Sequence, residues 1–160
     1  MIDGEQLILG DPALLDLARA ARKLAYVPYS GFQVGAAVID DRNRIFTGCN
    51  IENASYGATC CGERTAIFKA ISEGARAIRR LAVVGGESGP CMPCGICRQV
   101  MAEFAEPDFC LVTDARPGEP KKAVADANEN PEDENILRLT MQELLPNAFK
   151  LEIRTARRVN

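Results

Sequence analysis

The sequence contains no histidine and no tryptophan, and aromatic residues make up only 6% of its 160 residues. The absence of histidine excludes an imidazole as general base, so any transition-metal site must be built from thiolates and carboxylates. The sequence also lacks an uncharged apolar run of about 18 residues, and Asp3 and Glu5 precede its first apolar stretch. We therefore expect no membrane span and no signal peptide, which predicts a cytoplasmic protein.

An excess of basic residues is missing as well, since the formal net charge is -3 and the isoelectric point is near 5.1. Proteins that bind nucleic acid need clustered lysine and arginine, so we expect no nucleic-acid partner. The 47% hydrophobic and 26% charged content is typical of a globular chain. We assign residues 1–149 to a single domain and residues 150–160 to a basic tail, which we interpret as solvated or as a subunit contact.

The sequence is unusually rich in cysteine. Seven cysteines are an odd count in a chain without an export signal. This pattern favours reduced thiols for metal binding or catalysis over a full disulfide framework.

The hydrophobic pattern predicts an α/β fold. Asp11 is expected to cap a first helix that has Pro12 at its first position and ends before Pro28. Gly74 is expected to end a second helix. The further predicted elements are a β-hairpin over 32–40 and 45–49, helices over 62–73 and 95–104, strands over 81–84 and 109–113, a polar loop over 115–135, and a strand with a short helix over 137–149. Strands that alternate with helices imply a sheet covered on both faces.

Two motifs carry the chemistry, and each is predicted to open a helix. Cys61 begins Cys-Gly-Glu, and Cys94 and Cys97 belong to Pro-Cys-Gly-Ile-Cys. Helix amino termini favour the thiolate, the form that binds metal. Three thiolates can hold zinc and leave a fourth tetrahedral position for water, the arrangement of a catalytic site. Glu63 then lies beside the metal without being needed as a ligand, which suits a general acid/base.

The same residues also allow simpler interpretations. The three cysteines could be ordinary buried residues and Glu63 a first-turn helix carboxylate, although two such motifs together weigh against it. Cys91 extends the second motif to Cys-x-x-Cys-x-x-Cys, a spacing that also occurs in iron-sulfur ligation. A structural zinc or iron-sulfur module with Cys91 as fourth thiolate is therefore the non-enzyme alternative, and it would leave no position for water.

Longer strings identify a family. Residues 48–57 read GCNIENASYG, residues 63–66 ERTA, residues 97–99 CRQ and residues 143–146 ELLP. With Cys-x-Glu and Pro-Cys-x-x-Cys, the signature of zinc deaminases in its all-cysteine form, the chain resembles the homotetrameric zinc-dependent cytidine deaminases from about residue 14 to residue 149. The resemblance implies a three-layer α/β/α sandwich with a mixed central sheet and the hydrolytic deamination of cytidine and 2'-deoxycytidine in pyrimidine salvage.

The resemblance also implies roles for single residues. It makes Cys61, Cys94 and Cys97 the ligands of one zinc ion per chain, and Glu63 the proton shuttle. Substrate contacts are implied for Phe32, whose ring would pack on the base, for Asn50 and Glu52 at the ribose 3'-hydroxyl, and for Phe149, which would reach a neighbouring subunit's site.

Two more roles follow from the chemistry of the motif. Three thiolates on one zinc ion leave a net negative charge, and the guanidinium of Arg64 is our candidate to offset it. Gly62 stands where the family usually has alanine, and its N–H could still bind the base O2. A deaminase of another amino-pyrimidine nucleoside, such as a blasticidin-type or N4-substituted cytidine, remains the alternative activity.

Overall fold

A computed structural model describes residues 9–86, 89–115, 135–149 and 151. Its five strands form one mixed sheet in the order β2-β1-β3-β4-β5, with β3 and β4 parallel and the other neighbours antiparallel. The strands are β1 (Val34–Asp40), β2 (Ile45–Cys49), β3 (Ile78–Gly85), β4 (Ala105–Asp114) and β5 (Ile136–Thr140). The helices are α1 (Asp11–Arg22), α2 (Gly62–Ser72), α3 (Gly95–Phe104), α4 (Met141–Leu144) and the 3-10 helix η1 (Tyr56–Ala58).

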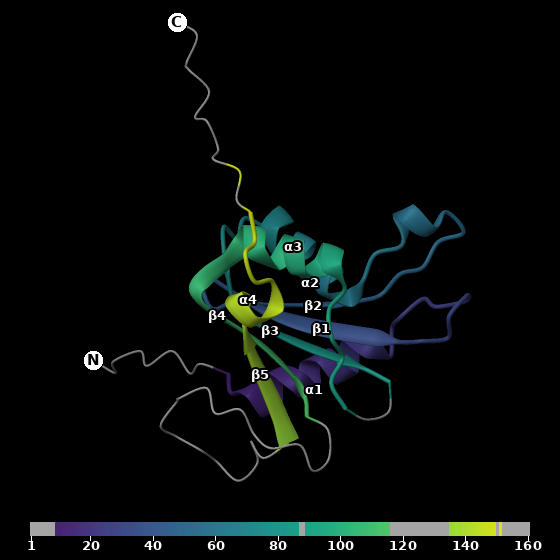
Figure 1. Ribbon diagram of the computed structural model, residues 1–160. Coiled ribbons are helices and arrows are strands. Elements are labelled where there is room, and N and C mark those ends of the chain that lie inside the picture. The colour runs from purple at the N-terminus through teal and green to yellow at the C-terminus, as the bar shows by residue number, and fades with distance from the viewer. Residues whose placement is uncertain (1–8, 87–88, 116–134, 150, 152–160) are drawn as a thin grey trace, which may run out of the picture.

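The sheet lies between two helical layers, as Figure 1 shows: α1 covers one face, and α2 and α3 cover the other. Every residue of β1 is buried because helices cover both of its faces. Ala36 and Val38 pack with α2 and α3, whereas Ala37 and Ile39 pack with α1. The predicted three-layer α/β/α fold with a mixed sheet is confirmed.

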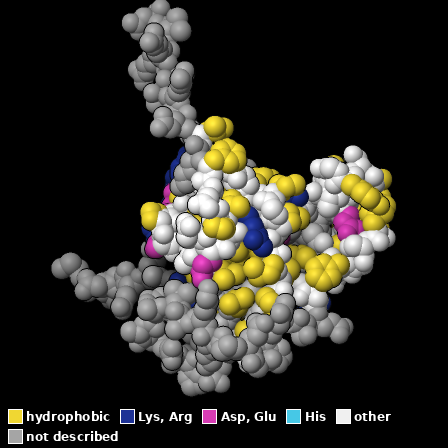
Figure 2. Space-filling model, viewed as in Figure 1, with side chains coloured by type: hydrophobic (Ala, Val, Ile, Leu, Met, Phe, Trp, Pro, Cys, Tyr) yellow, Lys and Arg dark blue, Asp and Glu magenta, His cyan; other side chains and the backbone are white. Residues whose placement is uncertain are grey.

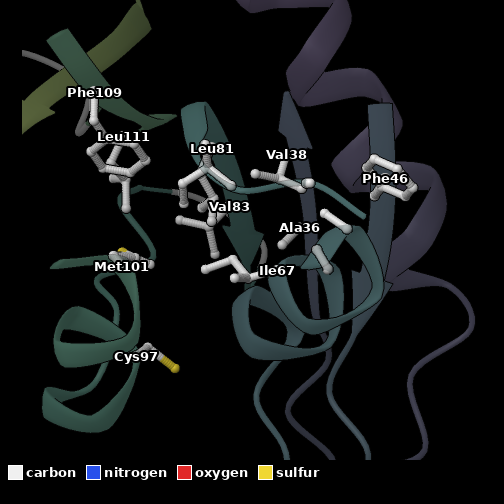
Figure 3. Close-up of a cluster of buried hydrophobic side chains, with 14 of the residues drawn as sticks. Ala36, Val38, Phe46, Ile67, Leu81, Val83, Cys97, Met101, Phe109 and Leu111 are labelled. Carbon is white, nitrogen blue, oxygen red and sulfur yellow. The ribbon is translucent and has the colours of Figure 1, made fainter. Parts of the chain in front are cut away.

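The larger of the two cores reaches the candidate metal site. Figure 3 shows Val38, Ile67, Leu81 and Met101 in this cluster, and the predicted ligand Cys97 lies at its edge, fully buried. Burial in a close-packed core restricts the Cys97 side chain to one position. One ligand is therefore fixed by the same packing that stabilises the fold.

The predicted cap of the first helix is wrong by one residue. Gly10 is the N-cap of α1, and Asp11 lies inside the first turn. The Asp11 carboxylate instead accepts hydrogen bonds from Arg80 on β3 and Arg138 on β5, each at 2.7 Å. A buried carboxylate between two guanidinium groups ties α1 to two strands, and this pairing outweighs its use as a cap.

The strands β3 and β4 are longer than predicted. Their additional residues include charged ones, which the apolar pattern did not assign to a strand. Arg79 of β3 pairs with Glu106 of β4 at 2.9 Å, so polar residues continue both strands beyond the apolar runs. The predicted loop 115–135 and tail 150–160 lie largely outside the described residues. At the loop's ends, the Ala115 N–H donates to the Asn135 carbonyl at 2.7 Å. Within the described ranges no helix has the length and apolarity to cross a membrane.

Two glycines bring the helices against the sheet. A Cβ added at Gly35 would lie 2.0 Å from the Ala18 carbonyl oxygen of α1, and one at Gly48 would lie 2.4 Å from the Ala66 nitrogen of α2. Both obstacles are helix backbone, which cannot turn aside as a side chain can. Glycine at these positions therefore sets the distance between each helix and the sheet.

We predict that Gly48→Ala destabilises the protein strongly, because the added methyl pushes α2 away from β2. Overpacking of this kind costs about 1–3 kcal/mol or more, which lowers the melting temperature by roughly 5 °C. Gly57→Ala is the control, since a Cβ there meets nothing within 4 Å. Thermal unfolding that is equal for the two variants would contradict the close-approach role of Gly48.

Candidate metal and substrate site

Two helix starts converge on one side of the sheet. Cys61 is the N-cap of α2, Cys94 is the N-cap of α3, and Cys97 follows in the first turn of α3. The three sulfur atoms lie within 4.8 Å of one another, with Cys61 and Cys94 separated by 3.9 Å and Cys94 and Cys97 by 3.5 Å. The sequence motifs, 33 residues apart between Cys61 and Cys94, thus form a single cluster.

The thiols of Cys61 and Cys97 differ in pKa. A hydrogen bond from the Cys97 thiol, aided by the Arg64 guanidinium, lowers the pKa of Cys61 to about 5. The same hydrogen bond and burial raise the pKa of Cys97. Cys61 is therefore a ready thiolate, and metal binding would release the proton that Cys97 holds.

Arg64 lies beside the sulfur atoms, as expected. One of its terminal nitrogens donates to the Thr59 carbonyl at 2.9 Å and to Cys61 Sγ at 3.6 Å. Its Nε is buried and has no hydrogen-bond partner within the described part of the chain. A half-buried cation with a donor to spare fits a centre that carries net negative charge, so the residues suit three thiolates around zinc.

Glu63 is in the first turn of α2 and is 3% exposed. Burial raises its pKa, and the negative charge of Cys61 adds to the shift. A carboxylate in this position is close to the cluster without being one of its members. It is available to move protons rather than to bind metal.

Cys91 does not join the cluster. Cys61, Cys94 and Cys97 are the only group of metal-binding side chains found among the described residues. The Cys91 backbone N–H donates to Thr113 Oγ1 at 3.0 Å, and burial raises the pKa of its thiol to about 12. A thiol that lies outside the three-sulfur cluster argues against the structural zinc and iron-sulfur alternatives, which need Cys91 as fourth ligand.

Phe32 is half-exposed rather than part of the core. Its side chain is 50% exposed, and its ring lies against Gly85 and Gly86 at the end of β3. A Cβ at Gly85 would lie 2.8 Å from Cys91 Sγ and 3.1 Å from two atoms of the Phe32 ring. The glycine makes room for both side chains, so the ring and the Cys91 thiol both lie against the end of β3.

Asn50 and Glu52 both bind the segment that carries Phe32. Asn50 accepts from the Val34 N–H and donates to the Phe32 carbonyl, each at 2.8 Å. Glu52 Oε2 accepts from the N–H groups of Tyr29 at 2.9 Å and Ser30 at 3.2 Å. Sequence reasoning missed this second role. Each side chain still has a donor or lone pair left for a ligand hydroxyl.

Gly62 and Phe149 are the last two predicted substrate residues. At Gly62 an added Cβ would lie 3.3 Å from Val34, so the alanine common in the family would fit with only a small shift. Phe149 is 65% exposed and follows α4.

Arg98 supports the segment that carries Cys94, a role that sequence reasoning missed. Its Nε donates to the Pro93 carbonyl at 2.9 Å and another nitrogen donates to the Leu144 carbonyl at 2.8 Å. It thereby joins the segment before Cys94 to α4. Only the tertiary structure brings residue 144 here, so no local signal could have identified the contact.

The fold and the cluster define a class, the zinc-dependent deaminases, whose signature combines Cys-x-Glu with Pro-Cys-x-x-Cys. Residues 10–113 match the family model "Cytidine and deoxycytidylate deaminase zinc-binding region". Because this match covers more than half of the sequence, the chain belongs to the cytidine and deoxycytidylate deaminase family.

Relatives and solved structures agree with this assignment. The chain is 42% identical to a cytidine deaminase of Sporosarcina psychrophila, over 87% of this chain and 90% of the relative. It is 45% identical to one of Halalkalibacterium halodurans, over 87% of this chain and 93% of the relative. The crystal structure of a cytidine deaminase from Burkholderia pseudomallei superposes with a TM-score of 0.72 at 40% identity, covering 88% of this chain and all of that one.

We predict one zinc ion per chain in the purified protein, measured by elemental analysis. Cys94→Ser should lose most of the zinc, and since Cys94 is exposed the fold should survive. Cys91→Ser is the matched control and should keep it. Loss of metal from Cys91→Ser, or iron with sulfide in the wild type, would contradict the three-thiol site.

Proposed function

We propose that this protein hydrolyses cytidine and 2'-deoxycytidine to uridine and 2'-deoxyuridine, releasing ammonia, in cytoplasmic pyrimidine salvage. The observation that carries the proposal is the buried carboxylate of Glu63 next to three clustered thiols. Zinc held by Cys61, Cys94 and Cys97 would supply Lewis-acid activation of water at this place.

Glu63 would move the protons of the reaction. Water adds at C4 of the pyrimidine, and Glu63 accepts a proton from it and passes it to N3. Glu63 then takes the proton of the new C4 hydroxyl and delivers it to the amino nitrogen, so the C4–N bond breaks, ammonia leaves and the C4 carbonyl of the product forms. Burial of Glu63 excludes bulk water as a competing proton source.

The base is held by groups around the cluster. Phe32 would pack against the ring face, and the Gly62 N–H would bind the base O2. Arg64, which already donates to Cys61 Sγ, would offset the charge of the thiolates.

The sugar would be recognised by Asn50 and Glu52. Both are rigidly held by hydrogen bonds to the segment around Phe32, and both retain hydrogen-bonding capacity. Glu52 would accept from the ribose 3'-hydroxyl. A phosphate in place of this hydroxyl would face a carboxylate, so the proposed substrate is a free nucleoside.

We also propose a homotetramer with shared active sites. Large hydrophobic side chains are exposed, among them Leu24 at 78%, Tyr56 at 77% and Phe149 at 65%. Figure 2 shows hydrophobic side chains at many places on the visible face. Exposed apolar side chains of this size favour burial against another subunit, and Phe149 would enter a neighbour's site.

The test is a turnover assay that follows ammonia release and the spectral change to uridine. We expect cytidine and 2'-deoxycytidine to be deaminated, and cytosine to be a poor substrate because it lacks the sugar that Asn50 and Glu52 would hold. Cytidine 3'-monophosphate should be at least several-fold weaker, because its phosphate opposes Glu52. Equal turnover of the 3'-monophosphate would contradict the role of Glu52, and no turnover of either nucleoside would contradict the function.

A further inference from the structure

The loop between α1 and β1 carries Phe32, and it runs beside the loop that contains η1. Both project beyond the sheet on the right of Figure 1. The Tyr26 N–H donates to the Asn50 carbonyl at 3.0 Å, and the Glu52 N–H donates back to the Tyr26 carbonyl at 2.9 Å. The residues proposed to hold the base and the sugar thus come from two loops joined by backbone hydrogen bonds.

Besides the Asn50 amide, which donates to the Phe32 carbonyl, the Ser30 side chain connects the two proposed subsites. The Ser30 hydroxyl donates a hydrogen bond to Glu52 Oε1. Ser30 Oγ in turn accepts a hydrogen bond from the Phe32 N–H at 3.0 Å. Its donor and one of its lone pairs are therefore used on Glu52 and on the backbone of Phe32. Ser30 is exposed, so packing does not hold it in place.

The chain between Ser30 and Phe32 needs such a restraint. Gly31 has a φ of +67°, and a Cβ there would meet nothing within 4 Å, so no packing defines its conformation. Glycine also loses more conformational freedom on ordering than other residues. Hydrogen bonds from the Phe32 N–H to Ser30 and from the Gly31 N–H to the Val27 carbonyl at 3.0 Å therefore help to fix this turn, together with those of Glu52 and Asn50 to the same segment.

We propose that Ser30 is a positioning residue that couples the carboxylate of Glu52 to the backbone of Phe32. Binding of a sugar hydroxyl by Glu52 and placement of the Phe32 ring on the base then occur together. The inference rests on the proposed function, because it takes Glu52 as the sugar acceptor and Phe32 as the ring on the base.

The hydrogen-bonding capacity of Glu52 supports this coupling. Oε2 already accepts two backbone N–H groups, and Oε1 accepts the Ser30 hydroxyl, which leaves Oε1 one lone pair for a ligand. The hydrogen bond from Ser30 is also the main cause that lowers the pKa of Glu52. Ser30 thus helps to keep this acceptor ionised and turned in one direction.

The test compares cytidine with 3'-deoxycytidine in the full-length, zinc-loaded wild type and in Ser30→Ala and Ser30→Thr. For cytidine we expect Ser30→Ala to lower kcat/KM by about 10-fold or more, a loss typical of a misplaced binding group. For 3'-deoxycytidine, which has no 3'-hydroxyl for Glu52, the loss should be much smaller. Ser30→Thr keeps the hydroxyl and should restore most of the activity and the discrimination. Zinc content should not change in either variant.

The other possible results would contradict the coupling, the sugar role of Glu52 or the proposed function. If Ser30→Ala loses the same factor with both nucleosides, Ser30 only stabilises the turn and the coupling is wrong. The same holds if Ser30→Ala has no effect, or if Ser30→Thr is as impaired as Ser30→Ala. A wild type that uses both nucleosides equally well would overturn the sugar role of Glu52 and the coupling with it. Failure of the wild type to deaminate cytidine at all would overturn the proposed function itself.

Discussion

The close approach of three thiols at the starts of α2 and α3 is the constraint on which the rest of the site depends. Sulfur atoms within 4.8 Å of one another cannot all ionise unless positive charge compensates them. Two helix amino termini and the guanidinium of Arg64 provide part of that charge, and a bound metal provides the remainder. The carboxylate of Glu63 is then buried beside a centre whose ligands are already supplied.

The fold keeps this arrangement rigid from several sides. Gly48 sets the position of α2, and therefore of Cys61, against the sheet. Cys97 is fully buried at the edge of the main core, and Arg98 anchors the segment before Cys94 to α4. Core packing thus positions the metal ligands, so a change in the packing around Gly48 or Cys97 should affect metal binding.

Much of this architecture could be predicted from the sequence because its signals are local. Apolar periodicity predicted the order of helices and strands, and α3 has the same limits as the predicted helix over 95–104. Charged stretches caused the errors. Arg79 lies in β3 although it interrupts the apolar pattern, because Glu106 on the neighbouring strand neutralises it. The local sequence favours Asp11 as a cap because the two arginines that bind its carboxylate are remote in sequence.

In the site, too, local motifs could be predicted from the sequence and contacts between remote segments could not. Cys-x-Glu and Pro-Cys-x-x-Cys are short motifs, and the structure brings their thiols together as predicted. The hydrogen bonds of Asn50 and Glu52 to the segment around Phe32 could not be foreseen, since they depend on how two loops pair. Ser30 and Arg98 act only through such contacts, so no spacing in the sequence distinguishes them.

The central claim is that the thiols hold the metal while Glu63 moves protons, and Glu63→Gln tests it most directly. Zinc content, melting temperature and turnover of cytidine would be measured together, with Glu73→Gln at the exposed far end of α2 as control. General acid/base groups contribute about 100- to 10,000-fold, and one that serves several proton transfers should lie near the top of this range. We predict a folded, zinc-loaded variant with that loss of turnover. More than about a tenth of wild-type turnover, or loss of zinc along with activity, would contradict the claim.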